Sequence, residues 1–410
     1  MEQRLNVFRK LTATKVNRAI FRRENETVRN YGQALIAGLL LFLAAGCSAD
    51  KPSGTVQVML IHPSGPGCQY SISPAPIDTL SSITKMTGLV GSVVVNSQNL
   101  ATDPSILDNG AGFNPIDVNF IQSGGTYAPQ DLNTLFAVSL YYAVEKGYEL
   151  FAGLDPTADL AQIVPNFSQT LIVDEARRTF GDVGAKPEVS DNAEYLPHDV
   201  QVGGQTVGTR NYFLSYPTST VTQIPLGLNL GIMVHEFTHM VFHYLFYAPA
   251  FAQNEQVSNT KPTAHTLASL DEGLADYFGY LVTGDPSFFE CSFPQENRDL
   301  GVPKSFTSQI VSDIAGTDNF DAHEGGAIFA AVNYEIGIAL GNPQLNGKYL
   351  IHFMATLLNC PAAQSGTNTM SLDFAGVAAC QAAAADPSAQ GIIQQTWAKY
   401  LGAYAGGIGQ

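Results

Sequence analysis

The stretch GIMVHEFTHMVFH, residues 231–243, decides how the rest of the chain is interpreted. His235 and His239 are four residues apart, and on an α-helix this spacing places both side chains on one face, where they can bind a single metal ion. Glu236 lies one residue round the helix, near such an ion but outside its ligand shell. Zinc suits imidazole ligands and requires a third protein ligand. The pattern also suits an amphipathic helix whose histidines are merely packed, and the stretch alone leaves both interpretations open.

A second segment, SLDEGLADYFG at residues 269–279, carries two acidic residues at the same helical spacing. Glu272 can complete a zinc shell, and Asp276, one turn later, can accept a hydrogen bond from the free ring nitrogen of a ligating histidine. Ser269 and Glu272 also match a capping box at a helix start. Because Glu272 follows the HExxH motif by 33 residues with Asp276 in step, we interpret it as the third ligand.

Together these motifs resemble those of the thermolysin-like and fungalysin-like zinc endopeptidases, the gluzincins, which carry HExxH on one helix and Glu-x-x-x-Asp on the next. The resemblance covers roughly residues 130–400. It implies one catalytic Zn²⁺ ion, with Glu236 as general base and Asp276 as partner to a ligand histidine, expected to be His235. The zinc ligands that it implies are His235, His239 and Glu272.

The segment DNFDAHEGGAIFAAVNYEIG, which begins at Asp318, matches a third feature of that family. Family members have a histidine before a helix rich in small residues, with an Asp five residues earlier that orients it. His323 and Asp318 match this spacing, and the resemblance implies that His323 stabilises the oxyanion. A surface turn is the alternative setting for His323.

The segment DNAEYLPH is similar to the edge strand on which these enzymes bind an extended peptide. The resemblance implies that Asn192 and the carbonyl of Ala193 pair with the substrate backbone. Tyr195 stands where the family usually has Trp, and a local Asx turn at Asn192 is the alternative. The family's acidic calcium-binding cluster has no counterpart in this sequence, so no calcium is predicted.

The resemblance implies a zinc metalloendopeptidase that hydrolyses peptide bonds of extracytoplasmic proteins through metal-activated water. Two alternatives stay open: a gluzincin aminopeptidase, and an inactive zinc-binding surface lipoprotein. The Gly-x-Met-Glu-Asn-like motif expected of the aminopeptidase is missing from the sequence. Glu236 and His323 are not needed to hold zinc, which favours an enzyme over the inactive protein.

The start of the chain has the features of an export signal. A basic stretch precedes ALIAGLLLFLAA at residues 34–45, whose 12 apolar residues suit a signal peptide and are short for a membrane span. AAGC, ending at Cys47, resembles the lipobox of bacterial lipoproteins, which implies lipidation of Cys47 and an extracytoplasmic, lipid-anchored protein, with the outer membrane favoured. A plain signal peptide or an uncleaved anchor is the alternative.

Composition restricts the class of partner. Hydrophobic residues make up 45% of the chain and charged residues 14%, as in a globular protein. The net charge is −16, and residues 47–410 hold 12 Lys and Arg against 33 Asp and Glu. A peptide or protein substrate is compatible with this balance, whereas nucleic acid is not expected, because a phosphate backbone requires a basic face. The sequence does not indicate an oligomeric state.

Four cysteines remain after Cys47, and an even number in an exported chain predicts two disulfides with three possible pairings. Cys360 with Cys380 is the most local pairing, and it would leave Cys68 with Cys291.

The predicted fold is α+β, with a thermolysin-like cleft between two subdomains. Residues 1–46 are assigned to the signal peptide and residues 47–125 to an irregular N-terminal region with strand-like runs such as TVQVMLI and LVGSVVV. The metallopeptidase domain is assigned to residues 126–410, with an α+β part to about 230 and a helical part after it. A helix is expected from Asp131, and the helix with the HExxH motif is expected to begin at Pro225 and to end by Pro249.

Overall fold

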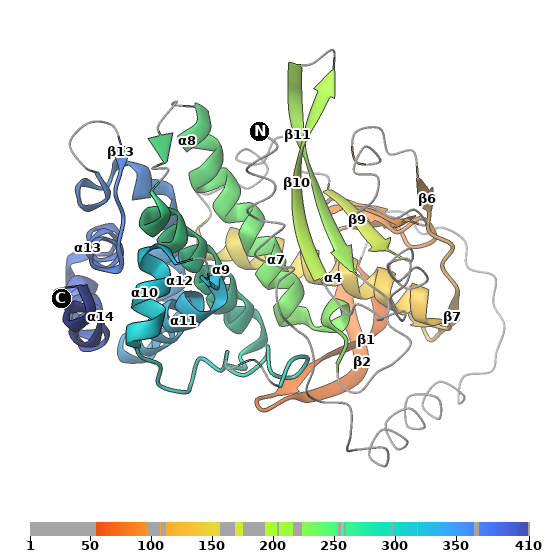
Figure 1. The fold of residues 1–410 in the computed structure, drawn as a ribbon. Helices are drawn as coiled ribbons and strands as arrows, with labels where there is room; N and C mark the ends of the chain where they lie inside the picture. Colours follow the sequence, from red (N-terminus) through yellow and green to blue (C-terminus); the bar gives the residue numbers. More distant parts are fainter. Residues whose placement is uncertain are drawn as a thin grey trace.

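The computed structural model describes residues 55–96, 107, 112–155, 169–174, 193–202, 205–215, 224–252, 256–257, 260–294, 296, 298–317, 319–364 and 369–408. The fold is mixed α+β, with sheets in the N-terminal part and helices in the C-terminal part (Figure 1). The coarse fold class predicted from the sequence is therefore confirmed. Cys47, Asn192 and Asp318 lie outside the described residues.

The strands form two larger sheets and one small pair. Their bounds are β1 Val56–Gly65, β2 Gln69–Ile77, β3 Leu80–Ser82, β4 Thr87–Gly88, β5 Gly91–Asn96, β6 Phe113–Pro115, β7 Phe120–Ser123, β8 Thr126–Pro129, β9 Gln169–Asp174, β10 Ala193–Val202, β11 Gln205–Ser215, β12 Gln256–Val257 and β13 Thr369–Met370. One sheet has the order β2-β1-β8-β7, and the other has the order β10-β11-β9-β5-β4-β3 with β6 beside β5. The third sheet pairs β12 with β13.

The larger sheet joins segments that are far apart in the chain. TVQVMLI and LVGSVVV form β1 and β5 as expected from their apolar, β-branched composition. β5 then pairs in parallel with β9, and β9 pairs in parallel with β11. The N-terminal strands therefore belong to the same sheet as the β10–β11 hairpin, and β10 forms one end of the strand order.

The helices follow the expected order. Their bounds are α4 Leu132–Leu154, α7 Leu230–Phe242, α8 Ala248–Ala252, α9 Lys261–Thr283, α10 Ser308–Gly316, α11 Ala322–Ala339, α12 Pro343–Thr356, α13 Phe374–Ala384 and α14 Pro387–Ile408. Among the helices in the described ranges, none is both long and apolar enough to cross a membrane.

The helix with the HExxH motif differs at both ends from the sequence expectation. Pro225 precedes a short 3₁₀ turn, and the α-helix begins after Asn229, whose side chain accepts hydrogen bonds from the first free N–H groups. Beyond α7 the chain continues as a π-helical turn, His243–Tyr247, and then as α8, past Pro249. Pro249 is the second residue of α8, where proline is tolerated because the first-turn N–H groups need no helical partner.

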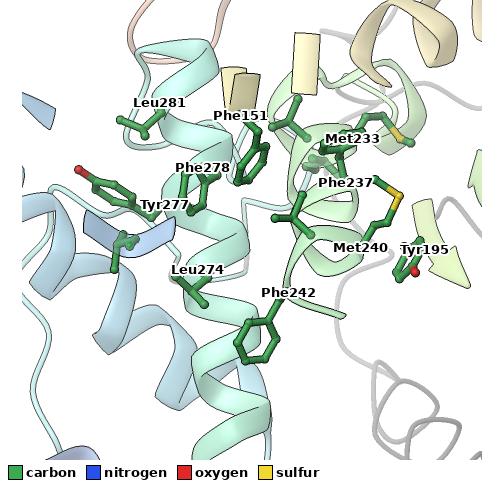
Figure 2. Close-up of a cluster of buried hydrophobic side chains, with 14 of the residues drawn as sticks. Phe151, Tyr195, Met233, Phe237, Met240, Phe242, Leu274, Tyr277, Phe278 and Leu281 are labelled. Carbon is green, nitrogen blue, oxygen red and sulfur yellow. The ribbon is translucent and has the colours of Figure 1, made fainter. Parts of the chain in front are cut away.

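Aromatic side chains join the two metal-motif helices to α4 (Figure 2). The ring of Phe151 on α4 lies 4.5 Å from that of Phe278 on α9 and 5.9 Å from that of Phe237 on α7. Gly147 lets α4 approach α7, because a Cβ at this position would lie 2.7 Å from the ring of Phe237. This buried contact sets the side of α7 that faces the core and leaves the histidine side toward α9 and β10.

Both predicted disulfides are formed, in the pairing that joins the two cysteines nearest in sequence, Cys360 and Cys380. Cys360 is bonded to Cys380, and Cys68 is bonded to Cys291 across 223 residues. The second bridge connects the turn after β1 to the loop after α9. In the same place the backbone N–H of Cys68 donates a hydrogen bond to Asp285.

Candidate metal centre

The two histidines of the HExxH motif lie side by side on α7, and a carboxylate from α9 faces both. The Nε2 atoms of His235 and His239 are 3.0 Å apart. An oxygen of Glu272 lies 3.4 Å from Nε2 of His235, and its other oxygen lies 4.0 Å from Nε2 of His239. One ligand atom from each of the three residues falls within 4.8 Å of the others.

These separations fit a tetrahedral metal ion. With bonds of about 2.0–2.1 Å, two ligand atoms of a tetrahedral zinc ion lie about 3.3 Å apart. The observed values of 3.0, 3.4 and 4.0 Å bracket that distance. In addition, the Nδ1 atoms of both histidines face carboxylates, which favours a proton on each Nδ1. In that tautomer both Nε2 atoms carry a lone pair, and the two lone pairs point toward each other. A cation between them relieves this repulsion, and the donor set of two imidazoles and one carboxylate is one that zinc accepts.

Each histidine has its own carboxylate partner on α9. Nδ1 of His235 lies 3.0 Å from Oδ1 of Asp276, which is the contact that the family resemblance implies. Nδ1 of His239 lies 2.8 Å from Oδ1 of Asp271. The earlier histidine contacts the later aspartate, so α7 and α9 run antiparallel at the site. Asp271 directly precedes Glu272, and this position is the only sign in the sequence that it could lie at the site.

A buried arginine completes this side of the site. Arg298 is only 4% exposed, and its Nη2 and Nε atoms lie 2.5 and 3.0 Å from the two carboxylate oxygens of Asp276. The guanidinium also lies 3.7 Å from the ring centroid of Phe289, a cation–π contact. Arg298 lies 22 positions beyond Asp276 in an irregular loop. No periodic pattern in the sequence would predict that it contacts Asp276.

Glu236 points to the sheet side of the site. Its Oε2 accepts a hydrogen bond of 2.8 Å from the backbone N–H of Tyr195 on β10. Because backbone groups alternate along a strand, Ala193 directs its N–H and carbonyl to the same side of β10 as Tyr195. Ala193, one of the two predicted substrate-pairing residues, therefore lies on the edge of the sheet that faces Glu236.

His323 reaches the site from the first turn of α11. Its Nε2 lies 3.4 Å from an oxygen of Glu272, and its Nδ1 lies 2.8 Å from Oδ1 of Asp321. Asp321 is the N-cap of α11, so the carboxylate that caps the helix also holds the ring. The family spacing predicts Asp318 for this orienting role. Among the described residues, the aspartate that contacts His323 is Asp321.

The interpretation of Ser269 as a helix cap is excluded. Ser269 is fully buried inside α9, which begins eight residues earlier at Lys261. Glu272 therefore occupies a helix interior, where nothing requires a capping carboxylate.

The carboxylates of the site have different electrostatic environments. Burial raises the pKa of Glu236, and Glu272 adds to this effect, although the two histidines of α7 oppose it. Burial also opposes charge on Glu272, but His323 and the α7 histidines more than offset it, so its pKa lies well below the ordinary value. The site therefore favours the ionised form of Glu272, a candidate ligand, and disfavours the ionised form of Glu236.

The remaining groups carry shifts set by their ion pairs. Burial would raise the pKa of Asp276, but Arg298 and His235 lower it further than burial raises it. Burial disfavours charge on His239, but the carboxylate of Asp271 more than offsets this and raises the pKa of His239 to about 10. Burial also disfavours charge on His323, but the carboxylates of Glu272 and Asp321 more than offset this effect and raise the pKa of His323.

The π-helical turn after α7 lies near the same carboxylates. Burial raises the pKa of Tyr247 well above its ordinary value, and the charges of Asp271 and Glu272 raise it further. His243 packs with the rings of Tyr244 and Tyr247 and does not extend the row of candidate ligands, which agrees with the expectation that it packs.

No protein-family model matches this chain, and no curated protein matches it.

Proposed function

We propose that this protein is a zinc-dependent endopeptidase of the thermolysin-like class, with its active site between the sheet part and the helical part. The observation that carries the proposal is the hydrogen bond of 2.8 Å from Tyr195 N–H to Glu236. It ties the edge strand β10 to the helix that bears His235 and His239. A peptide paired with β10 would therefore lie beside the candidate metal centre.

The arrangement contains more than a metal-binding structure requires. His235, His239 and Glu272 suffice as protein ligands and leave a fourth position open. Glu236 and His323 are not needed to hold an ion, yet both border the three ligands. This surplus of acid–base and hydrogen-bonding groups favours catalysis over a purely structural metal site.

The zinc ion, when bound by His235, His239 and Glu272, supplies Lewis acidity toward the substrate carbonyl and toward water. Glu236 takes the proton of the attacking water and later delivers it to the nitrogen of the leaving amine. Its raised pKa suits both directions of this transfer. His323, whose Nδ1 lies 2.8 Å from Oδ1 of Asp321, would donate from Nε2 to the oxyanion that develops at the carbonyl.

The edge strand provides the means of holding substrate. Ala193 offers backbone groups on the side of β10 that faces Glu236, and Asn192 precedes it in the chain. An extended peptide pairs with such an edge through main-chain hydrogen bonds, which tolerate many side chains. This mode of binding favours an endopeptidase over an aminopeptidase, which instead needs groups that hold a free amine.

The proposed setting is extracytoplasmic. The export signal and the lipobox-like AAGC at Cys47 support a lipid anchor, and the two disulfides suit an oxidising compartment. Proteins or peptides outside the cytoplasm are the proposed substrates, with zinc as cofactor and no role for nucleic acid.

The test combines zinc content with casein cleavage for the wild type, Glu236→Gln and a control, Glu324→Gln, which changes an exposed residue of α11. We expect one zinc ion per chain in all three proteins and loss of cleavage in Glu236→Gln alone. A wild type that binds zinc but cleaves neither casein nor peptides would support the inactive surface protein instead. Cleavage that requires a free N-terminus on a matched pair of blocked and unblocked peptides would support the aminopeptidase.

A further inference from the structure

Tyr195 on the edge strand β10 is attached to its surroundings at both ends of the residue. Its backbone N–H donates a hydrogen bond of 2.8 Å to Glu236 on α7. Its hydroxyl donates a hydrogen bond of 2.8 Å to Oδ1 of Asn211 on β11. The side-chain nitrogen of Asn211 donates in turn, over 3.0 Å, to the hydroxyl of Tyr244 in the π-helical turn after α7. We call the side chains of Tyr195, Asn211 and Tyr244 the tyrosine clamp.

The tyrosine clamp lies in the interior of the protein. Tyr195, Asn211 and Tyr244 are all buried, so a hydrogen bond lost between them leaves a polar group without a ready partner. The buried groups therefore favour the arrangement in which every hydrogen bond of the clamp is made. The ring of Tyr195 also packs against that of Phe213, with 5.3 Å between the ring centroids, and this contact restricts the direction of the hydroxyl.

The clamp gives β10 a second attachment to the helix that carries Glu236. Tyr244 follows Glu236 by eight residues, a separation of roughly 12 Å along a helix that rises about 1.5 Å per residue. The hydrogen bond to Glu236 alone would let the strand pivot about one point, whereas two attachments this far apart fix its tilt against the helix. β10 forms one end of the strand order in the described part of the sheet, so its outer side depends on this contact with the helix.

We propose that the three residues of the tyrosine clamp are positioning residues for the general base. By fixing the tilt of β10 against α7, they keep the carboxylate of Glu236 aimed at the site and the backbone of Ala193 aligned with it. The inference rests on the proposed function and deepens it, because it assigns part of the catalytic rate to side chains that act only through β10. A tryptophan, which the family usually has at position 195, would lack this hydroxyl.

The first experiment measures kcat and KM for a quenched fluorescent peptide, blocked at both ends, with the zinc-loaded wild type, Tyr195→Phe, Tyr244→Phe and the double variant. Each substitution removes one hydroxyl and keeps the ring. Each single variant is expected to lose about 10–100-fold in kcat/KM, chiefly in kcat, because a displacement of about 1 Å in a catalytic group can cost about 100-fold. The zinc dissociation constant should stay at the wild-type value.

The double variant tests whether the clamp acts as one unit. Once either tyrosine has lost its hydroxyl, the second attachment of β10 to the helix is already broken. The double variant is therefore expected to lose little more activity than the more impaired single variant, which is the non-additivity of residues in one network. Losses of activity that multiply in the double variant would show two independent effects and would contradict the clamp.

Tyr212→Phe is the matched control. Tyr212 follows Asn211 on β11 and is also buried, but it points to the opposite face of the sheet, where its hydroxyl donates to the carbonyl of Leu107. The control loses a buried hydrogen bond and leaves the attachment of β10 to the helix intact, so its kcat and KM should match the wild type. If Tyr195→Phe and Tyr244→Phe also lower only the unfolding temperature and keep wild-type kcat and KM, the clamp is merely structural and the inference is overturned.

Hydrogen–deuterium exchange tests the clamp without catalysis. The backbone N–H of Tyr195 is held by Glu236, and its exchange can be resolved by mass spectrometry of fragments from residues 193–197. Tyr244→Phe changes an atom on another element, yet it is expected to speed the exchange of this N–H, because β10 can then move on α7. Tyr212→Phe should exchange as the wild type does. Wild-type exchange in Tyr244→Phe would overturn the inference.

These outcomes separate the clamp from the proposed function. A zinc-loaded wild type that cleaves no peptide would remove the proposed function, and the exchange of the Tyr195 N–H would still decide whether the clamp holds β10 on α7. An active wild type whose kcat and KM are unchanged in both phenylalanine variants would overturn only the clamp. If Tyr195→Phe fails to fold, Tyr244→Phe decides, since it leaves β10 unaltered.

Discussion

Gly326 of α11 packs directly against Glu272 of α9. A Cβ at position 326 would lie 2.7 Å from Cβ of Glu272 and 3.0 Å from the backbone nitrogen of Gly273. Gly273 is its counterpart on α9, since a Cβ there would lie 2.5 Å from the carbonyl oxygen of Gly326. The two glycines let the helices approach closely, and this approach brings His323 at the start of α11 to the carboxylate of Glu272.

Gly326→Ala is expected to destabilise the protein by about 1–3 kcal/mol, because the added methyl group overlaps atoms of a packed helix that cannot move aside alone. The same displacement shifts Glu272, so zinc affinity should fall as well. The matched control is Gly391→Ala on the exposed side of α14, where a Cβ meets nothing within 4 Å. There alanine should stabilise the helix by up to about 1 kcal/mol. Denaturant unfolding measures the stability of each variant, and chelator competition measures its zinc affinity. Equal stability and equal zinc affinity in Gly326→Ala and the wild type would contradict the packing argument.

Asp321→Asn is expected to lower kcat/KM more than Asp318→Asn does. Asp321 caps α11 and holds Nδ1 of His323 at 2.8 Å, whereas the family spacing points to Asp318. Removal of the charge that orients His323 weakens its hydrogen bond to the oxyanion, a contact whose complete loss costs about 10²–10³ in kcat. Peptide hydrolysis at saturating and low substrate, with zinc content as control, measures the difference. A larger loss in Asp318→Asn would assign the orienting role to that residue.

The two disulfides are expected to contribute unequally to stability. A disulfide restricts the unfolded chain more strongly when it closes a longer loop. Cys68–Cys291 spans 223 residues and should contribute about 5 kcal/mol to stability. Cys360–Cys380 spans 20 residues and should contribute about 3 kcal/mol. Double Cys→Ser variants of each bridge, unfolded in urea, give the comparison. The order would be reversed if the sheet part and the helical part unfold independently, because the long bridge then constrains little.

His243 is expected to make stability depend on pH. Burial lowers the pKa of His243 to about 4, against 6.5 in the unfolded chain, although the charge of Asp199 on β10 opposes the shift. Between these values the unfolded state binds more protons, so stability falls as pH drops from 6.5 toward 4 and the loss is complete below 4. The magnitude is up to about 3 kcal/mol, since each pKa unit corresponds to about 1.4 kcal/mol.

The measurement compares urea unfolding of the wild type and His243→Gln at pH 7 and at pH 4. The wild type should lose more stability than the variant over this range, because glutamine does not titrate. Parallel losses would show that His243 is as accessible to protons in the folded chain as in the unfolded one.

Local patterns predicted much of the element order. The apolar runs of β1 and β5 and the helical spacing of α4, α9 and α11 lie in neighbouring residues, so they can be found without knowledge of the fold. The pairing of β5 with β9 could not be found in this way. Parallel strands distant in sequence carry no mutual signal in a single chain.

The continuation of the helix past Pro249 has a similar explanation. A proline ends a regular helix in most sequences, but the π-helical turn His243–Tyr247 comes first and lets α8 begin with Pro249 in its first turn. Tyr244 anchors that turn through a hydrogen bond to Asn211 on β11. The outcome thus depends on a contact between distant elements.

The sequence by itself determined which residues can share one face of a helix: His235 with His239, and Glu272 with Asp276. A period of 3.6 residues per turn acts within each segment and does not depend on the rest of the chain. Only the tertiary structure decided that Asp271 holds His239, that Arg298 holds Asp276, and that Tyr195 donates to Glu236. Those contacts join elements from different parts of the chain, and they exist because glycine and aromatic packing fixes how α7, α9, α11 and β10 approach one another.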